Sequence, residues 1–315
     1  MGDLAADRIY DEHVDDDAAY LATGTGVARV RVANCRVGRF DLLSRGTATD
    51  VAACTWGDEL LIAAATPEEV LVHVPDGDEW TGTGFGPAEA VGFDHTDPDD
   101  PALIAVGADD HEVGRVLDPA ADPTRWLTVA DVDAPVRAVD GPFLAAEDGV
   151  YRLSPDGIDD AGLDDVRDVA VVEAAGELPA GSTGEPQADG DADDGGDDLP
   201  WRHGDVLAAA GDGLFRLDGA GGWTRVLEGS FDGVAVHGSI GIAAGEDGGH
   251  VRGPARTGDG WQAVDLAAAA VGVGAAAYAV TGDGTFLSRE SEGWRRRTLG
   301  FPQVRAMSVV PGDGE

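Results

Sequence analysis

Arginine is the residue type in this sequence whose spacing points most directly to chemistry. A short motif, Val-Arg-x-Val or Val-Arg-x-Met, occurs three times, with its arginine at Arg137, Arg167 and Arg305. If the three segments are equivalent strands of a repeat fold, their guanidinium groups lie at one height around a common axis. Such a ring would bind an anion or a carboxylate by charge-assisted hydrogen bonds. The alternative is that each arginine pairs with a neighbouring acid, such as Asp168 or Glu89.

A second group of arginines lies near the two ends of the chain. Arg29 and Arg31 are two residues apart, as are Arg295 and Arg297. Residues two apart in a strand share a face, so each pair would project from one side of its strand. Few acids accompany them, which predicts a neutral-to-positive patch for an acidic protein or for RNA phosphates. The alternative is a solvated surface with internal ion pairs. The wider group includes Arg36, Arg39, Arg45 and Arg296.

Catalytic and metal-binding motifs are absent from the sequence. It has no G-x-S-x-G elbow, no P-loop and no H-x-x-x-H pair among its seven histidines. Cys35 and Cys54 are too few for a disulfide framework or a cysteine-based zinc site, so we expect small buried side chains there. We therefore expect no cofactor and no metal centre. A metal site assembled from histidines of different repeats is the alternative.

The elements that must position these arginines are short β-strands. The clearest stretch, Asp205–Val236, contains four apolar runs separated by turns rich in glycine and aspartate. Such runs are typical of strands in hairpins, because glycine supplies the positive φ of tight turns. Four runs per unit predict blades of four strands each.

This unit recurs along the chain at a nearly fixed period. Its turn glycine lies at Gly213, Gly249 and Gly284, which are 36 and 35 residues apart, and weaker copies precede them. A regular period in this range is the signature of a repeat architecture. Seven units fit, which predicts an all-β, seven-bladed β-propeller of four-stranded antiparallel blades. A tryptophan follows each of the three glycines, at Trp223, Trp261 and Trp294.

The ring must close by joining the two ends of the chain. The first blade lacks its innermost strand, whereas Val304–Val310 is a lone strand of that type. Joining them removes both exposed sheet edges. The alternative closing strand is Arg8–Val14. Residues 1–315 are thus predicted to be one domain, with a disordered acidic insertion at about 174–200, where almost no large apolar residue occurs.

The composition is strongly acidic. The formal net charge is −39, and all 21 basic residues are arginine. Such a chain repels itself unless salt screens it, and in molar salt the Debye length is only about 3 Å. We therefore expect a protein of a halophilic archaeon. The alternative is an acidic surface made for a cationic partner. Without a signal peptide or a membrane-spanning apolar run, we expect a cytoplasmic monomer with no membrane association.

Several hairpins resemble degenerate Asp-box, or BNR-type, repeats of the form S-x-D-x-G-x-x-W. Ser154–Gly157 keeps the start of this motif, while Thr257–Trp261 and Ser288–Trp294 keep its end. Over its full length the chain also resembles a group of haloarchaeal β-propeller proteins. These resemblances imply the propeller fold and carry no established activity.

Asp-box propellers include sialidases, which need an arginine triad, a Tyr–Glu nucleophile pair and an acidic aspartate. Tyr151 and Tyr278 instead fall at regular strand positions, where packing explains them. We therefore expect a non-enzymatic interaction platform, a scaffold or adaptor, with a protein partner and with RNA as a weaker alternative. A propeller that binds a small anion or ligand is also consistent with the sequence, as is a glycosidase-like hydrolase with its site at the channel mouth.

Overall fold

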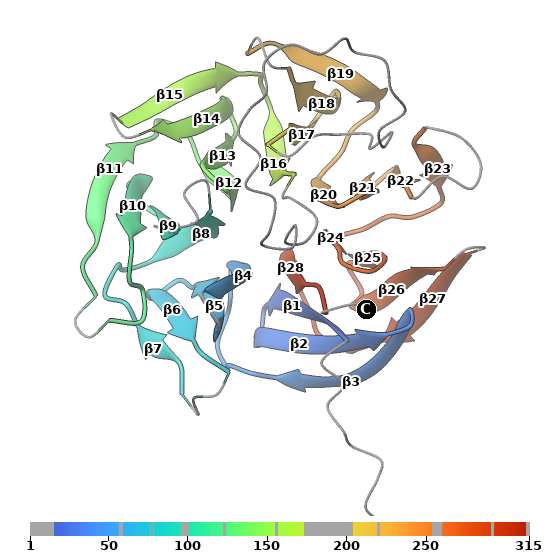
Figure 1. Ribbon diagram of the computed structural model, residues 1–315, viewed down its shortest axis with the longest axis horizontal. Helices are drawn as coiled ribbons and strands as arrows, with labels where there is room; N and C mark the ends of the chain where they lie inside the picture. Colours follow the sequence, from blue (N-terminus) through green and yellow to red (C-terminus); the bar gives the residue numbers. More distant parts are fainter. Residues whose placement is uncertain are drawn as a thin grey trace, which may run out of the picture.

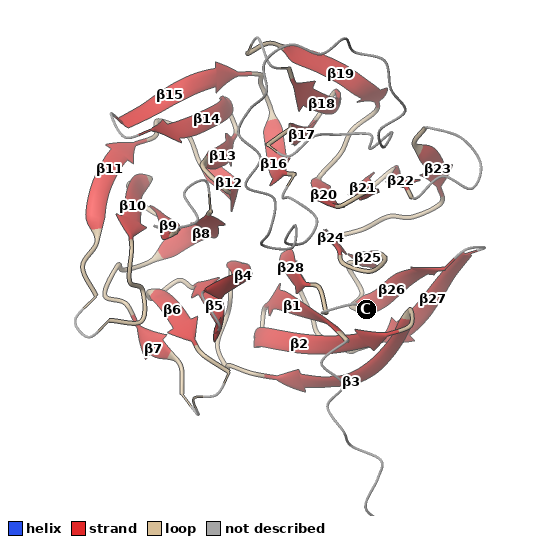
Figure 2. Cartoon of the chain, in the orientation of Figure 1, coloured by secondary structure: helices blue, strands red, loops and turns tan. Residues whose placement is uncertain are grey.

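The computed structural model shows a ring of seven β-sheets around a central axis (Figure 1). Strands and short loops make up the whole described chain, which contains no helix (Figure 2). The acidic insertion predicted at about 174–200 and the alternative closing strand Arg8–Val14 lie outside the described residues. The structure describes residues 16–56, 59–75, 77, 79–95, 101–121, 124–154, 157–172, 204–218, 221–253, 260–290 and 293–312.

Each sheet is a blade of four antiparallel strands, and blades 2 to 7 run outward from the axis in chain order. Blade 2 has β4 (Asp50–Trp56), β5 (Glu59–Ala65), β6 (Val70–His73) and β7 (Thr81–Gly82). Blade 3 has β8 (Ala88–Asp94), β9 (Ala102–Gly107), β10 (Glu112–Val116) and β11 (Leu127–Asp131). Blade 4 has β12 (Val136–Asp140), β13 (Phe143–Ala146), β14 (Gly149–Ser154) and β15 (Gly157–Gly162).

The remaining chain-ordered blades repeat this pattern. Blade 5 has β16 (Val166–Val171), β17 (Val206–Ala210), β18 (Gly213–Leu217) and β19 (Trp223–Glu228). Blade 6 has β20 (Gly233–His237), β21 (Ile240–Gly245), β22 (Gly248–Arg252) and β23 (Gln262–Val264). Blade 7 has β24 (Ala270–Val273), β25 (Ala277–Val280), β26 (Thr285–Glu290) and β27 (Gly293–Thr298).

Blade 1 closes the ring, because it combines strands from both ends of the chain. Its order from the axis outward is β28, β1, β2, β3. The last strand pairs antiparallel with the first, from Ala18 opposite Val310 to Ala22 opposite Ala306. The predicted closure by the C-terminal strand is therefore confirmed. The strands are β1 (Asp17–Thr23), β2 (Gly26–Ala33), β3 (Arg36–Leu42) and β28 (Ala306–Val310).

Tight turns separate the strands, and one glycine shows why that residue is needed. Gly26 begins β2 with a φ of 135°, a conformation that side chains rarely adopt. A Cβ atom there would lie 2.0 Å from the carbonyl oxygen of Ser44. Both the conformation and the lack of space exclude other residues. The glycine thus fixes the β1–β2 hairpin, on which the closing strand docks.

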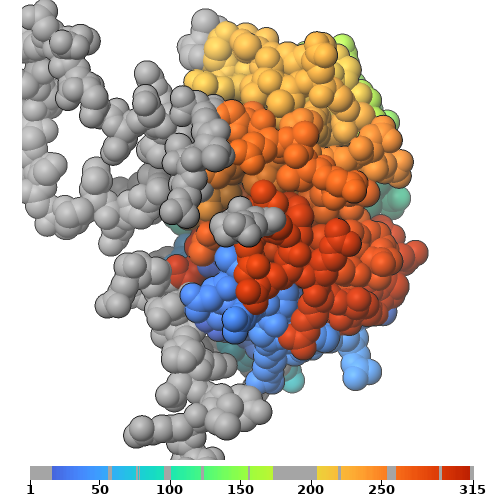
Figure 3. Space-filling view, turned by 90° about the vertical axis from the view of Figure 1, so that its right-hand side faces the viewer, coloured from blue at the N-terminus to red at the C-terminus, as the bar shows by residue number. Residues whose placement is uncertain are grey.

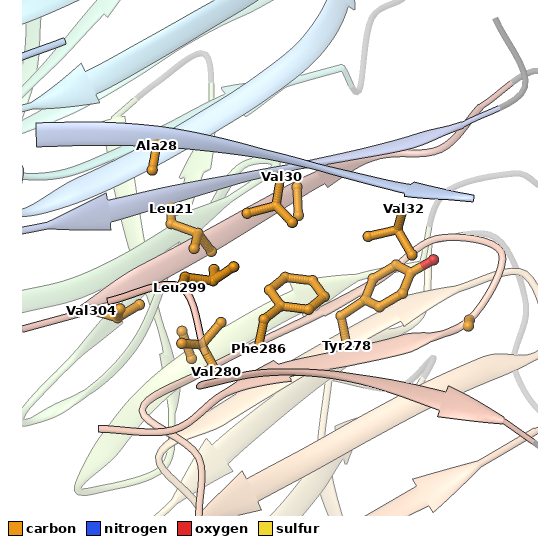
Figure 4. Close-up of a cluster of buried hydrophobic side chains, with 12 residues drawn as sticks. Leu21, Ala28, Val30, Val32, Tyr278, Val280, Phe286, Leu299 and Val304 are labelled. Atoms are coloured by element: carbon orange, nitrogen blue, oxygen red, sulfur yellow. The ribbon is translucent and has the colours of Figure 1, made fainter. Parts of the chain in front are cut away.

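The hydrophobic core is divided among the seven blade boundaries. One buried cluster lies between each pair of neighbouring blades, built from alternate residues of the inner strands. At the boundary of blades 1 and 7, Leu21 and Val30 face Phe286 and Tyr278 (Figure 4). Each blade therefore buries both of its faces, and the ring forms one continuous body.

Side-chain carboxylates also join the inner strands of neighbouring blades. In blade 2, Asp50 accepts a hydrogen bond from the Val91 N–H of blade 3, at 2.9 Å. In blade 5, Asp168 accepts one from the Val234 N–H of blade 6, at 2.8 Å. An innermost strand pairs on one side only, so its free N–H groups need such acceptors. Two further acids do the same: Glu89 for Val136 at 2.8 Å and Asp140 for Val171 at 2.7 Å.

We call these four carboxylates, Asp50, Glu89, Asp140 and Asp168, the inner-edge acids. Blade 1 uses other acceptors at its two boundaries. The hydroxyl of Ser308 accepts the Ala53 N–H of blade 2 at 3.0 Å, and Asp17 accepts the Ala275 N–H of blade 7 at 2.7 Å. Six of the seven blade boundaries thus carry a side-chain-to-backbone bond among the described residues.

The inner-edge acids make a testable contribution to stability. Replacing Asp168 by alanine leaves the N–H groups of Val169 and Val234 without their acceptor. An unsatisfied buried N–H destabilises a protein by about 1–3 kcal/mol. We expect Asp168→Ala to lower the free energy of unfolding by about that amount, measured by urea denaturation in molar KCl near pH 6.

The control for this experiment is Asp247→Ala, in the exposed turn between β21 and β22. This change removes a carboxylate from the same acidic chain without touching an inner strand, so it should leave the denaturation midpoint unchanged. Equal midpoints for the two variants would contradict the role of Asp168.

Candidate functional site

The innermost strands of all seven blades line a cavity of about 810 Å³ on the ring axis. Figure 1 looks along this axis, with β4, β8, β12, β16, β20, β24 and β28 nearest the centre. A cavity of this size is within the range of small-molecule sites. Arg137, Arg167 and Arg305 all contribute to its lining, so the structure places the three arginines of the repeated motif around one cavity.

Two of these arginines occupy the same irregularity in neighbouring blades. The pairing of β12 with β13 shifts between Val136 and Ala138, and that of β16 with β17 shifts between Val166 and Asp168. Arg137 and Arg167 are therefore the extra residues of two β-bulges. A β-bulge changes the direction in which its extra side chain points, so both arginines depart from the regular alternation of the strand.

Ion pairs compensate the charges of these two bulge arginines. Arg137 lies 2.7 Å from Glu147. Arg167 lies 2.6 Å from Asp232 and 3.2 Å from Asp165. The sequence had suggested pairing with a neighbouring acid, and the acids that pair are these rather than Glu89 or Asp168. An anion at the cavity must therefore compete with carboxylates for both arginines.

Arg305 differs from the other two cavity arginines. It is exposed, and within the described part of the chain its side chain has no ion pair. Its backbone N–H donates to the Ala22 carbonyl at 3.0 Å, which fixes its position at the start of the closing strand. Arg305 is thus the cavity arginine most available to an incoming anion.

A third bulge, in blade 3, carries an acid at the equivalent position. The pairing of β8 with β9 shifts between Ala88 and Ala90, so Glu89 is the blade 3 equivalent of the two bulge arginines. Its carboxylate lies 2.9 Å from the Nδ1 atom of His111. The sequence indicated Glu89 only as an arginine partner, because a bulge cannot be read from residue types alone.

Two aspartates in the cavity wall have strongly raised pKa values. Burial raises the pKa of Asp50 to about 7, although hydrogen bonds from the Val91 and Val51 N–H groups act in the opposite direction. Burial likewise raises the pKa of Asp168 to about 8, against the N–H groups of Val234 and Val169. At neutral pH both groups therefore carry only part of a negative charge.

The second predicted arginine group is divided between two places. Tyr20 lies opposite Arg29 and belongs to the core cluster shared with blade 2. Val30 and Val32 belong to the cluster shared with blade 7. Strand alternation therefore turns Arg29 and Arg31 towards blade 2. Arg29 is also paired with Asp41 at 3.2 Å.

Arg295 and Arg297 lie on the opposite side of blade 1, at its boundary with blade 7. Arg297 donates to the carbonyl oxygens of Val37 and Gly38, at 2.7 and 2.5 Å, and its guanidinium carbon lies 5.0 Å from the centre of the Phe40 ring. Arg295 pairs with Glu290 of the neighbouring strand. The structure thus does not bring the four predicted arginines together, because blade 1 separates the two pairs.

A different arginine set gathers at this boundary. A cleft of about 220 Å³ lies between β3 and β27, and we call it the arginine cleft. Figure 3 shows this side of the molecule, where the blue surface of the first strands meets the red surface of the last. The residues that line the arginine cleft are Arg36, Val37, Arg295, Arg296 and Arg297.

Arg36 and Arg296 belong to the wider arginine group predicted from the sequence, although the four-residue candidate site did not include them. Both are exposed and have no ion pair within the described residues. Period-2 spacing favoured Arg295 and Arg297, and it passed over the residue between them.

The described residues were also compared with the requirements of a metal site and of a membrane-spanning helix. Among them, no group of three or more histidine, cysteine, aspartate or glutamate side chains could hold a metal ion. The same part of the chain has no helix long and apolar enough to cross a membrane.

Seven four-stranded blades around a central cavity define the protein as a seven-bladed β-propeller. A family model described as "Beta-prop_HVO_0234:-like, beta propeller" matches residues 3–310. The chain therefore belongs to this propeller family. Curated protein sequences give no match to it.

Solved propellers resemble the chain at low sequence identity. A chain of the nidogen/laminin complex is 8% identical with a TM-score of 0.52, covering 95% of this chain and 100% of that one. Apo AztD from Citrobacter koseri is 11% identical with a TM-score of 0.52, covering 95% and 99%. The WD40 propeller domain of Doa1 is 12% identical with a TM-score of 0.54, covering 90% of each chain. At these identities the likeness shows the fold alone.

The raised pKa values of Asp50 and Asp168 predict a pH-dependent part of the stability. The folded protein keeps protons on these carboxyls that the unfolded chain releases near pH 4. Their contribution to the free energy of unfolding is full below about pH 4, and it is lost as the pH rises through about 7 and 8. Relative to an Asp50→Asn/Asp168→Asn variant, the wild type should therefore lose stability across this window in urea denaturation.

Two exposed turn acids provide the control for this pH profile. An Asp109→Asn/Asp247→Asn variant removes the same number of carboxyls and should follow the wild-type profile. If the Asp50→Asn/Asp168→Asn variant also runs parallel to the wild type from about pH 5 to about pH 9, the two carboxyls titrate normally and the effect of burial is refuted.

Proposed function

We propose that the protein is a non-enzymatic interaction platform that binds an acidic protein partner at the arginine cleft. The observation that carries this proposal is four arginines lining one small cleft in a chain of net charge −39. Most of such a surface repels an acidic partner. A cleft of opposite charge therefore fixes where that partner binds and in which orientation.

The state of each arginine supports a binding role. Arg297 is held by two backbone carbonyls and by the Phe40 ring, so no carboxylate neutralises it among the described residues. Arg295 is held by Glu290. Arg36 and Arg296 are exposed and unpaired within the same residues. Arg297 lies opposite Phe286 and faces blade 1, whereas Arg296 lies opposite Leu287, which packs towards blade 6, so Arg296 extends from the rim beside the cleft.

The fold is suited to this role. Both faces of every blade are packed against neighbours, so the rim is a rigid surface on which binding does not require reordering of the backbone. A similar propeller chain is part of the nidogen/laminin complex, which supports an assembly role for a propeller of this size. Fold similarity alone does not assign a partner, so the arginine cleft carries the proposal.

The composition supports a cytoplasmic setting in a halophilic archaeon. A chain with net charge −39 and no lysine is stable against self-repulsion when salt is abundant. Salt of that strength also weakens exposed ion pairs. A partner must therefore contact the arginines directly rather than rely on attraction across open surface.

Capture from a haloarchaeal lysate in molar KCl tests the platform. We expect a stoichiometric protein partner to co-purify with the wild type and to be lost from an Arg295→Glu/Arg297→Glu variant. Arg125→Glu is the control, because Arg125 is exposed in blade 3 and its change adds negative charge away from the cleft. Equal recovery of the partner with all three proteins would refute the cleft as its binding site.

The central cavity supports a second candidate function, the binding of a small anion. The observation that favours it is Arg305, an exposed arginine without an ion pair among the described residues, in a cavity of about 810 Å³. Arg137 and Arg167 supply further donors if an anion displaces their carboxylates. The partial neutrality of Asp50 and Asp168 lessens the repulsion that such an anion would meet.

Calorimetric titration with small carboxylates such as citrate tests this second function. We expect binding to the wild type to weaken about tenfold or more in Arg305→Gln, which corresponds to the loss of one charge-assisted contact. Arg125→Gln should bind like the wild type. Unchanged binding in Arg305→Gln, or no binding to the wild type, would refute the cavity site.

A further inference from the structure

We propose that the boundary between blades 1 and 2 holds a small monovalent anion such as chloride, bound by the hydroxyl of Tyr20 and the guanidinium group of Arg31. This boundary lies on the opposite side of blade 1 from the arginine cleft, which blade 1 shares with blade 7. An anion there would bind independently of any partner at the cleft. An unsatisfied buried donor and the charges around it point to such a ligand.

The unsatisfied donor is the phenol of Tyr20, in the middle of β1. Tyr20 has an exposed fraction of 0%. Its hydroxyl has no hydrogen-bond partner among the described residues. Buried hydroxyl groups in folded proteins are nearly always hydrogen-bonded. An acceptor that is not part of the chain would satisfy this one.

Strand register places two arginines beside this hydroxyl. Tyr20 lies opposite Arg29, and Ala18, two residues before Tyr20, lies opposite Arg31. Opposite residues of antiparallel strands have Cβ atoms about 5 Å apart, and diagonal neighbours are about 7–8 Å apart. Tyr20 belongs to the core cluster shared with blade 2, so strand alternation turns all three side chains towards that blade.

The charges around the hydroxyl leave one positive charge unbalanced. Arg29 is paired with Asp41 at 3.2 Å, whereas Arg31 has no ion pair among the described residues. Burial raises the pKa of Tyr20, Arg31 and Arg29 lower it, and Asp41 raises it, so these three charges act on the hydroxyl. Two arginines against one aspartate leave a single positive charge, which one monovalent anion balances.

Blade 2 closes this boundary without neutralising it. Among the described residues, no carboxylate of blade 2 forms an ion pair with either arginine. Ile62 packs in the Tyr20 cluster, and His73 lies opposite Ile62 with its ring stacked on Trp80, 5.0 Å between ring centres. The Nε1–H of Trp80 donates to the Leu43 carbonyl of blade 1 at 3.1 Å, which holds the two blades together.

The burial of the site favours a halide over larger anions. The Tyr20 side chain is enclosed, and the Arg29 side chain is only 19% exposed. A carboxylate carried by a partner would have to bring its own backbone between two packed blades, whereas a single atom needs no such room. Water would accept the Tyr20 hydroxyl proton but would leave the charge of Arg31 unbalanced, and buried charges are normally paired.

The stability of a Tyr20→Phe variant in two salts tests the inference. Urea unfolding is measured in potassium chloride and in potassium gluconate at equal potassium concentration, because gluconate is too large to enter the boundary. In chloride the anion stabilises the folded wild type, so Tyr20→Phe should have the lower urea midpoint. In gluconate the wild type keeps an unsatisfied hydroxyl, so Tyr20→Phe should have an equal or higher midpoint.

The control for this comparison is Tyr151→Phe, which removes a hydroxyl that is bonded to Asp148. Its midpoint should differ from that of the wild type by the same amount in both salts. If the difference between Tyr20→Phe and the wild type is also the same in both salts, the anion is refuted and water is the acceptor of the Tyr20 hydroxyl.

Chlorine-35 NMR tests the role of Arg31 directly. The wild type should broaden the chloride resonance, and added bromide should reverse this broadening by competition. Arg31→Gln should lose most of the broadening, whereas Arg125→Gln, changed at an exposed site in blade 3, should retain it. Equal broadening by the wild type and Arg31→Gln would overturn the site, as would its absence from the wild type. Circular dichroism of each variant confirms that it is folded.

Discussion

The ring depends on the backbone N–H groups that its innermost strands leave unpaired. Each of these strands has a partner on one side only, and its other edge faces the central cavity. Asp50, Glu89, Asp140 and Asp168 each accept an N–H from the next blade. Hydrophobic contacts between blades have no preferred direction. The hydrogen bonds do, so they fix the position of each blade relative to the next. These four acids therefore have a structural role.

The arginine cleft is a consequence of the same closed ring. When β28 pairs with β1, blade 7 is held against blade 1, and the guanidinium of Arg297 reaches the carbonyls of Val37 and Gly38. Residues from the two ends of the sequence thus form one surface. The cleft forms between the first and last blades, so a ligand that binds there would also stabilise ring closure. A partner that occupies it would bridge the first and last blades.

The periodic sequence predicts the fold well because each blade repeats the same hairpin chemistry. The spacing of Gly213, Gly249 and Gly284 and the lone C-terminal strand predict the blades and their closure, which the structure confirms. The sites are harder to predict, since they depend on contacts between blades. Residue types do not reveal the bulges that carry Arg137 and Arg167, nor the acids that pair with them.

Native-state hydrogen exchange, measured residue by residue, tests the role of the inner-edge acids most directly. The amide hydrogens of Val91, Val136, Val171 and Val234 are each bonded to a carboxylate of the preceding blade. If these bonds hold the ring together, the four amides should exchange as slowly as the central strands, through global unfolding. Exchange at the rate of exposed turn amides would show that the blades are held by hydrophobic packing alone.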